Sequence, residues 1–230
     1  MVDFSVFEEK IGVVFKSKDL LKQAFTHRSY INEHQGLPLG HNERLEFLGD
    51  AVLELAVTEY LYKKYPDKPE GDLTSYRSAL VNTSTLSTVA TGLGMNDFLL
   101  LSRGEAKDTG RARQYLLANT FEALTGALYL DQGYGAAQQF IAQNIFPLTD
   151  DIVSQKLFQD AKSHFQEKAQ EKVSITPGYR SLKEEGPDHD KEFTVGVFLD
   201  DELIATGEGK SKQEAEQAAA RAGLEKKGWQ

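Results

Sequence analysis

The sequence predicts two domains, an all-α domain over residues 1–150 and a small α+β domain over residues 160–230, joined by a linker at residues 151–159. Three observations lead to this prediction. Apolar residues recur at helical spacing as far as about residue 150, and no stretch there alternates cleanly with a period of two. After Pro147, the segment LTDDIVSQKLFQD is typical of a boundary. Beyond it, the order becomes helix, three strands and helix.

Five runs in the first domain predict helices, at residues 21–31, 43–65, 71–94, 113–133 and 134–146. Clusters of Gly and Pro separate the runs, at residues 36–40, 66–71, 92–94 and 133–135, and such residues commonly end helices.

An acidic stripe marks the predicted helix at 43–65. On a helical wheel, one arc holds Leu45, Leu48, Val52 and Leu55, and the nearly opposite arc holds Glu43, Glu46 and Asp50. Like charges at these spacings destabilise an isolated helix by a few tenths of a kcal/mol for each pair, so the stripe needs an explanation. A solvated face is the simplest one.

A second carboxylate lies in the predicted helix at 113–133. This helix is apolar or small on almost every side and should be buried, yet it has Glu122 at its centre and Asn119 one turn before it. A buried carboxylate must be neutralised, paired or bound to a metal. Pairing with Arg44, Arg77 or His27 and binding to a metal both remain open from the residues alone.

Two helices therefore present oxygen ligands, Glu46 and Asp50 from one, and Asn119 and Glu122 from the other. The chain contains no Cys, and hard oxygen ligands suit Mg²⁺ or Mn²⁺ better than zinc.

The second domain begins with a helix at 160–173. In the strand region, Phe193, Val195, Val197 and Leu199 alternate with other residues, and a hairpin turn is predicted at residues 200–201. The final helix, at 210–228, begins with a capping box formed by Ser211 and Glu214.

Composition and charge limit the possible functions. The net charge is −9, with 20 acidic against 15 basic residues before residue 160 and 15 against 11 from residue 160 onward. Nucleic-acid-binding proteins are usually basic, so any contact with phosphate must come from a local patch. The early acids and the short apolar runs favour a soluble, cytoplasmic protein without a membrane span.

Several blocks together resemble a known family. HNERLEFLGDAVLELAV is similar to the signature motif of the ribonuclease III family, and THRSYINE, PEGDLTSYRSALVN and ANTFEALTGALYLDQGY resemble its other blocks in order. From residue 160 onward the chain resembles a double-stranded RNA-binding domain, through GPDHDKEFTV and GKSKQEAEQAAA.

The resemblance implies roles for these residues. Glu46, Asp50, Asn119 and Glu122 would hold Mg²⁺, for which Mn²⁺ can substitute, while Glu43 and Glu70 would contribute near the cleaved strand or the dimer interface. It also implies a symmetric homodimer that cleaves double-stranded RNA, leaving 5′-phosphates, 3′-hydroxyls and short 3′ overhangs, in the processing of ribosomal and other precursor RNAs.

The resemblance also assigns RNA contacts in the second domain. It implies that Gln166, Glu167 and His189 reach the minor grooves. Lys210 and Lys212 lie at the start of a helix, where free N–H groups favour phosphate. The family commonly has a second Lys where Gln213 stands, and many such domains have a basic residue where Glu216 stands, so weaker contact with phosphate is expected.

The chain departs from the family at one candidate ligand. Asn119 stands where the family usually has Asp, which lowers the charge of the four ligands from −4 to −3. This departure supports an alternative function, a non-catalytic protein that binds double-stranded RNA and has an impaired metal site.

Overall fold

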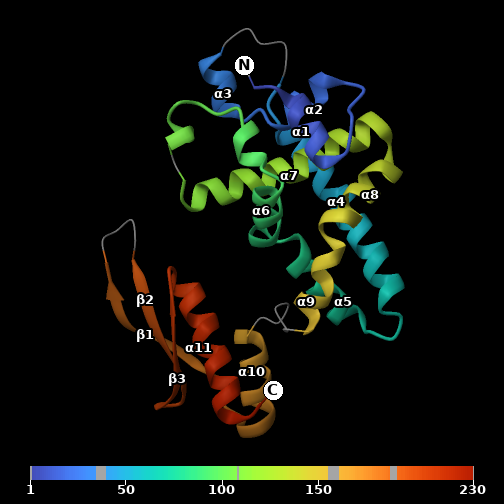
Figure 1. Cartoon of the computed structure of the whole chain (residues 1–230). Coiled ribbons are helices and arrows are strands. Elements are labelled where there is room, and N and C mark those ends of the chain that lie inside the picture. The colour runs from blue at the N-terminus through green and yellow to red at the C-terminus, as the bar shows by residue number, and fades with distance from the viewer. Residues whose placement is uncertain (1, 35–39, 108, 155–160, 187–190, 230) are drawn as a thin grey trace. The chain divides into compact units, whose positions relative to one another are not determined.

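The structure is a computed structural model that describes residues 2–34, 40–107, 109–154, 161–186 and 191–229. The chain divides into two compact units, Met1–Phe158 and Gln159–Gln230 (Figure 1). Each unit has a hydrophobic core of its own. Among the described residues, no helix has the length and apolar character needed to cross a membrane.

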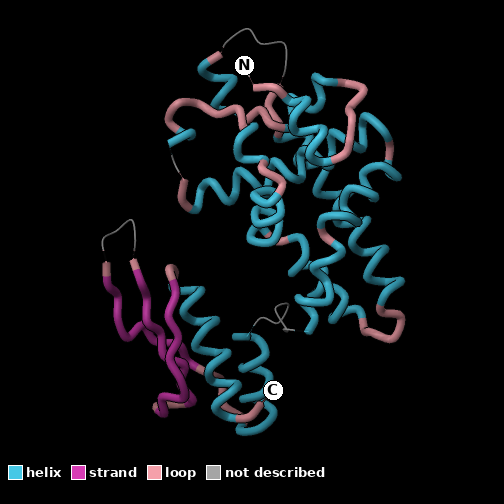
Figure 2. Tube along the Cα trace, in the orientation of Figure 1, coloured by secondary structure: helices cyan, strands magenta, loops and turns pink. Residues whose placement is uncertain are grey.

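The first unit is helical throughout its described residues, apart from short turns and one isolated bridge (Figure 2). Its α-helices are α1 (Phe4–Ile11), α2 (Lys18–Ala24), α3 (Arg28–Glu33), α4 (Glu43–Lys64), α5 (Glu70–Val81), α6 (Thr83–Gly92), α7 (Arg111–Gln132), α8 (Tyr134–Asn144) and α9 (Thr149–Ser154). Three short 3-10 helices join them: η1 (Met95–Phe98), η2 (Glu105–Lys107) and η3 (Phe146–Leu148). The predicted helices at 43–65, 113–133 and 134–146 are confirmed as α4, α7 and α8.

The prediction of one continuous helix at 21–31 is wrong. The chain leaves the helix at Phe25 and starts α3 only at Arg28, because the residues between pair with a distant segment. Leu100 N donates to Phe25 O and His27 N donates to Leu100 O, so that Thr26 and Leu100 form an isolated parallel bridge.

The predicted helix at 71–94 is also divided, into α5 and α6. Asn82 has an extended backbone, with ψ at 161°, and its side chain accepts a hydrogen bond from Thr85 N. Asn is a strong N-cap residue, and here it starts a new helix instead of continuing the old one.

The core of the first unit surrounds α7. From Leu117 to Leu128 nearly every residue of this helix is buried, as the all-round apolar pattern predicts. Glu122 is an exception, since it is only half-buried. On α4, Leu45 and Val52 are buried as predicted, but Leu55 is 58% exposed although it shares their arc.

The second unit has the predicted order, with α10 (Ala161–Val173), β1 (Gly178–Glu185), β2 (Glu192–Leu199), β3 (Glu202–Gly209) and α11 (Lys212–Lys227). The sheet is antiparallel in the order β1-β2-β3 (Figure 2). Leu199 pairs with Glu202, which confirms the two-residue turn at Asp200–Asp201.

The expected alternation along β2 does not appear in the burial of its residues. Val195 to Leu199 are all buried, because the outer face is covered as well as the inner one. The Arg180 guanidinium lies 4.6 Å from the centre of the Phe198 ring, and Leu203 packs near Gly196 on the same face.

Candidate active site

Two glycines let α4 and α7 cross with their backbones in contact. A Cβ atom added at Gly49 would overlap the carbonyl oxygen of Glu122, and one added at Gly126 would overlap the carbonyl oxygen of Leu45. Such an approach is open only to residues without a side chain. The crossing therefore brings the acidic stripe of α4 next to the polar residues of α7.

The four predicted ligands lie on the two sides of this crossing. Glu46, Asn119 and Glu122 are half-buried, and Asp50 is exposed. Burial raises the pKa of Glu122 to about 8, with further contributions from the negative charges of Asp50 and Glu46. The three carboxylates therefore form one electrostatic group.

The pKa of Glu46 is also raised. Burial is the largest cause, followed by the charges of Glu43 and Asp50, while a hydrogen bond from the Asn119 side chain works in the opposite direction. Asn119 therefore contacts a carboxylate from the other helix, although it carries no charge of its own.

The carboxylates of this group are near one another, but their oxygens do not converge on a common position. Within the described residues, no three His, Asp or Glu side chains stand in an arrangement that would hold a metal ion as it is. Burial is the main cause of the raised pKa of Glu122, and repulsion by the carboxylates of Asp50 and Glu46 adds to it. Three carboxylates and an amide oxygen are hard donors that fit a hard divalent cation.

The alternative of a basic partner for Glu122 fails. Arg77 donates to Thr58 Oγ1 at 3.0 Å, and His27 contacts Ser29 through Nδ1. Across the described part of the chain, neither Arg44 nor any other base forms an ion pair with Glu122.

Glu43 has partners that the sequence did not indicate. Arg28 Nε lies 3.0 Å from one carboxylate oxygen of Glu43, and His41 Nδ1 lies 3.7 Å from the other. The His41 nitrogen is buried and has no hydrogen-bond partner. Arg28 belongs to THRSYINE, one of the blocks that resemble the ribonuclease III family. Helical spacing does not connect this block to Glu43.

Glu70 is exposed at the first position of α5, where it accepts a hydrogen bond from Thr74 Oγ1 at 3.3 Å. It lines a largely apolar pocket of about 410 Å³ with Leu61, Tyr62 and Leu73. None of the four predicted ligands lines this pocket, so Glu70 belongs to a different surface feature.

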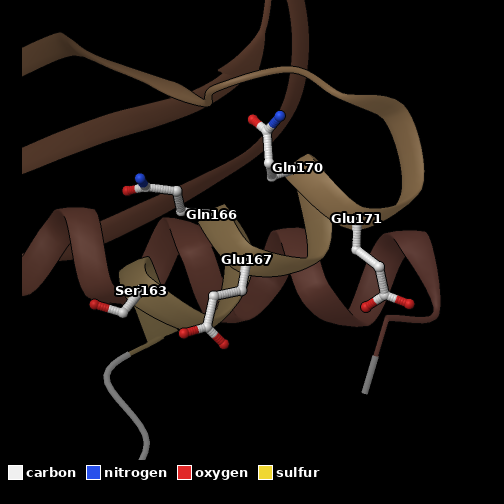
Figure 3. A pocket seen from close by; sticks show the side chains of 5 residues that line it. All are labelled: Ser163, Gln166, Glu167, Gln170 and Glu171. Atoms are coloured by element: carbon white, nitrogen blue, oxygen red, sulfur yellow. The ribbon is translucent and has the colours of Figure 1, made fainter.

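In the second unit, Gln166 and Glu167 are exposed on α10, whose other face buries Phe165 and Ala169. Figure 3 shows both side chains projecting from α10 along a hollow that is also lined by Ser163, Gln170 and Glu171. His189 lies outside the described residues.

Lys210 and Lys212 lie at the start of α11, and each faces a carboxylate from the sheet. Lys210 Nζ is 2.9 Å from Glu192, and Lys212 Nζ is 2.7 Å from Glu184. Ser211 Oγ accepts from Glu214 N at 3.2 Å, as the predicted capping box requires. The Glu214 carboxylate, however, accepts from Lys210 N, one residue before the cap.

Glu216 is also paired, with Lys162 of α10 at 2.6 Å. Lys162, Lys210 and Lys212 are therefore each already paired with a carboxylate of the same unit. A phosphate that binds here competes with these carboxylates for the lysines.

Comparisons with known proteins cover both units. Residues 17–149 match the family model described as Ribonuclease-III-like, and residues 161–227 match the double-stranded RNA binding motif. The chain is 50% identical over 218 residues to Ribonuclease 3 of Enterococcus faecalis, which covers 94% of each protein.

Solved structures agree with this for the first unit. The crystal structure of the nuclease domain of ribonuclease III from Campylobacter jejuni matches with a TM-score of 0.57 and 37% identity, over 64% of this chain and 96% of that one. A second structure of that domain, with a TM-score of 0.56 and 38% identity over 63% and 99%, is described as flexible in a region involved in dimer formation.

Proposed function

Because the chain belongs to the ribonuclease III family and is an endoribonuclease of that type, we propose that it hydrolyses double-stranded RNA with Mg²⁺ held between α4 and α7. The observation that carries the proposal is the group of carboxylates at the helix crossing, where Glu122 has a pKa of about 8. Burial and the charges of Asp50 and Glu46 disfavour the ionised form of Glu122, and a bound divalent cation would favour it.

Glu46, Asp50 and Glu122 would hold the ion, together with the side-chain oxygen of Asn119. A bound Mg²⁺ supplies a more acidic water and neutralises charge on the phosphate oxygens. In the proposed hydrolysis, a water oxygen forms a bond to phosphorus and the bond from phosphorus to the 3′ oxygen breaks. The phosphate then stays on the 5′ end of one fragment, and the other fragment ends in a 3′-hydroxyl.

The second unit would bind the duplex. Its Lys210 and Lys212 would contact phosphates, and Gln166 and Glu167 would contact the minor groove, where 2′-hydroxyls distinguish RNA from DNA. We place this activity in the cytoplasm, in the processing of ribosomal and other precursor RNAs.

A homodimer is supported by an apolar seam on α4. Phe47, Leu55 and Tyr62 are 81%, 58% and 73% exposed, and their spacing of eight and seven residues puts them on one face. Large apolar side chains exposed in a row indicate an interface. In a two-fold interface with antiparallel α4 helices, Phe47 of one copy would approach the apolar pocket beside Tyr62 of the other.

This interface can be tested with Phe47→Asp, because a charge in the seam should separate the copies. We expect sedimentation to show a monomer and cleavage of both strands to be lost. Val14→Asp is a matched control, since Val14 is also strongly exposed but lies outside α4. A Phe47→Asp protein that remains dimeric would refute the assignment of this seam.

The metal site can be tested with Glu122→Gln on a long RNA duplex. We expect cleavage in Mg²⁺ to be nearly abolished while duplex binding in a gel shift is retained, because the change lies in the other unit. Glu9→Gln, an exposed carboxylate on α1, controls for the change in charge. Much weaker RNA binding by Glu122→Gln would contradict the proposed division of labour.

The same cleavage assay tests the alternative function, a non-catalytic protein that binds double-stranded RNA. A wild-type protein that binds the duplex but leaves it intact in Mg²⁺ and in Mn²⁺ would support loss of the metal site through Asn119. The other three carboxylates, which are present and gathered at one crossing, argue against that loss.

A further inference from the structure

A small, partly open cavity lies beside the candidate metal ligands. It measures about 70 Å³ and is lined by His27, Glu43, Glu46 and Asn119, with Leu99 and Leu116 among its apolar walls. A water molecule in the liquid occupies about 30 Å³, so the cavity has room for about two. Its polar lining gives such waters hydrogen-bond partners.

The His27 ring is fixed in one tautomer by its neighbours. Ser29 N donates to His27 Nδ1 at 3.3 Å, and the Ser29 hydroxyl lies 2.8 Å from the same nitrogen. Ser102 N donates to that hydroxyl oxygen at 3.0 Å and holds the hydroxyl beside the ring, while the donation from Ser29 N requires a lone pair on Nδ1. Nδ1 is therefore an acceptor, and a neutral ring must carry its proton on Nε2.

The backbone around His27 is held equally firmly. His27 N donates to Leu100 O at 3.0 Å, and Asn42 N donates to Thr26 O at 2.9 Å, just before α4 begins. The ring is thus positioned relative to α4 by hydrogen bonds on both sides. Among the described residues, the structure gives Nε2 no protein partner, and His27 is one of the residues that line the cavity.

Of the two carboxylates in the cavity wall, Glu46 is the one that needs another donor. Glu43 already has Arg28 at 3.0 Å, whereas Glu46 has only the Asn119 side chain. A metal-binding carboxylate normally has its other lone pairs engaged by hydrogen bonds, which fix its orientation.

We propose that His27 is a positioning residue whose Nε2–H donates, through water in this cavity, to the carboxylate of Glu46 and fixes its orientation toward the ion. This inference rests on the proposed role of Glu46 as a ligand. His27 itself touches neither RNA nor metal.

Two variants separate this role from the N-cap role of His27 on α3. In His27→Asn, the shorter side chain can still accept from Ser29 N, but no donor remains at the position of Nε2. In His27→Gln, the amide nitrogen lies near the position of Nε2, so the donor to the cavity is kept.

We expect His27→Asn to weaken Mn²⁺ binding to the RNA-free protein about tenfold, as measured by electron paramagnetic resonance of the free ion. The Mg²⁺ midpoint for single-turnover cleavage should rise in parallel, and duplex binding in Ca²⁺ should not change. His27→Gln should restore both values to within about threefold of wild type. Wild-type Mn²⁺ binding in His27→Asn, or an equal loss in His27→Gln, would overturn the proposal.

Glu122→Gln, measured alongside, separates failure of this inference from failure of the metal site. If Glu122→Gln loses Mn²⁺ binding and His27→Asn does not, only the role of His27 is wrong; if neither loses it, the metal site is wrong as well. If a variant does not fold, a measurement on the wild-type protein still tests the proposed tautomer of His27. Nitrogen-15 NMR of the histidine rings should show His27 protonated on Nε2 alone, and a proton on Nδ1 would refute the inference.

Discussion

Asn119 gives the candidate metal site less negative charge than four acidic ligands would have. Asn119→Asp adds one charge next to the ion, and it also removes the hydrogen bond that Asn119 donates to Glu46. The second effect disfavours ionised Glu46 when no ion is bound, so the two oppose each other. Because the charge of the ion is the largest in such a site, we expect the first effect to dominate.

We therefore predict that Asn119→Asp lowers the Mg²⁺ concentration needed for half-maximal cleavage. A Mg²⁺ titration of both proteins on the same duplex measures it. An unchanged or raised midpoint would mean that Asn119 does not contact the ion, or that the site depends on its neutrality.

Glu122 should make the metal-free protein less stable at alkaline pH. Its folded pKa of about 8 lies above the ordinary value of 4.5, so the unfolded chain releases this proton first as the pH rises. The unfolding free energy should fall between pH 4.5 and 8, by on the order of 1–2 kcal/mol after allowance for partial exposure.

Glu122→Gln cannot lose this proton. In EDTA it should melt at a higher temperature than wild type at pH 8 and at nearly the same temperature at pH 4.5. Mg²⁺ at pH 8 should stabilise wild type more than the variant. A difference in melting temperature that does not depend on pH would show that Glu122 is not destabilised by folding.

The candidate ligands could be named from the sequence because each helix carries its own pair at helical spacing. The contacts of Glu43 could not, since Arg28 and His41 reach it only after α3 and α4 have packed. The same holds for the surroundings of His27, where Ser102 donates to the Ser29 hydroxyl from 73 residues away.

At the scale of elements, the contact between α4 and α7 should tolerate no side chain. Gly126→Ala would press a methyl group into the carbonyl of Leu45, a backbone atom that cannot rotate away. We predict a loss of about 3 kcal/mol or more in unfolding free energy, with loss of cleavage, because the helices must separate.

Gly71→Ala, in α5, is the control. A Cβ atom there meets nothing within 4 Å, so its effect on unfolding free energy should stay below about 1 kcal/mol. Chemical denaturation of both variants measures the difference, and equal stability would contradict the close crossing.

The carboxylates opposite Lys210 and Lys212 should weaken RNA binding. The double change Glu184→Gln and Glu192→Gln removes the carboxylates that face Lys210 and Lys212 and compete with phosphate for them. Exposed ion pairs are each worth up to about 1 kcal/mol, so we expect duplex affinity to rise roughly threefold to tenfold at low salt and less at high salt.

Glu202→Gln controls for the charge of the domain as a whole. Glu202 is also an exposed partner of a lysine, Lys227, but at the other end of α11. Filter binding of each variant to one duplex measures the effect. Glu202→Gln could raise affinity by as much, for each charge removed, as the double change does. In that case the overall charge of the domain, and not competition at Lys210 and Lys212, would be the cause.

Elements whose hydrogen bonds are internal could be predicted, and those that depend on distant partners could not. Helices α4 and α7 follow from periodicity alone, and the β2–β3 turn follows from two adjacent Asp residues. The break between α2 and α3 exists because Leu100 supplies both a donor and an acceptor. The sequence around residues 25–27 does not indicate these two contacts with Leu100.

At the scale of the whole molecule, the second unit should work without the first. It has a separate core, with Phe165, Val197 and Ile204 among its fully buried residues. We predict that residues 160–230 alone fold and bind duplex RNA in preference to duplex DNA, since 2′-hydroxyl contacts distinguish the two.

This affinity should fall as salt rises, despite a net charge of −4, because local lysines displace counterions from phosphate. Gel shifts with RNA and DNA duplexes of one sequence, at two salt concentrations, measure both effects. Equal affinity for RNA and DNA would count against the proposed 2′-hydroxyl contacts.

The crossing of α4 and α7 also constrains how the gene can change. Every single-nucleotide substitution that replaces a glycine introduces a side chain, so Gly49 and Gly126 have no conservative neighbour in the genetic code. A glutamate in the site can mutate to aspartate and keep its charge, but these glycines have no such intermediate. In a complete mutational scan, we therefore expect these two positions, which carry no chemistry, to be as intolerant as the carboxylates that they bring together.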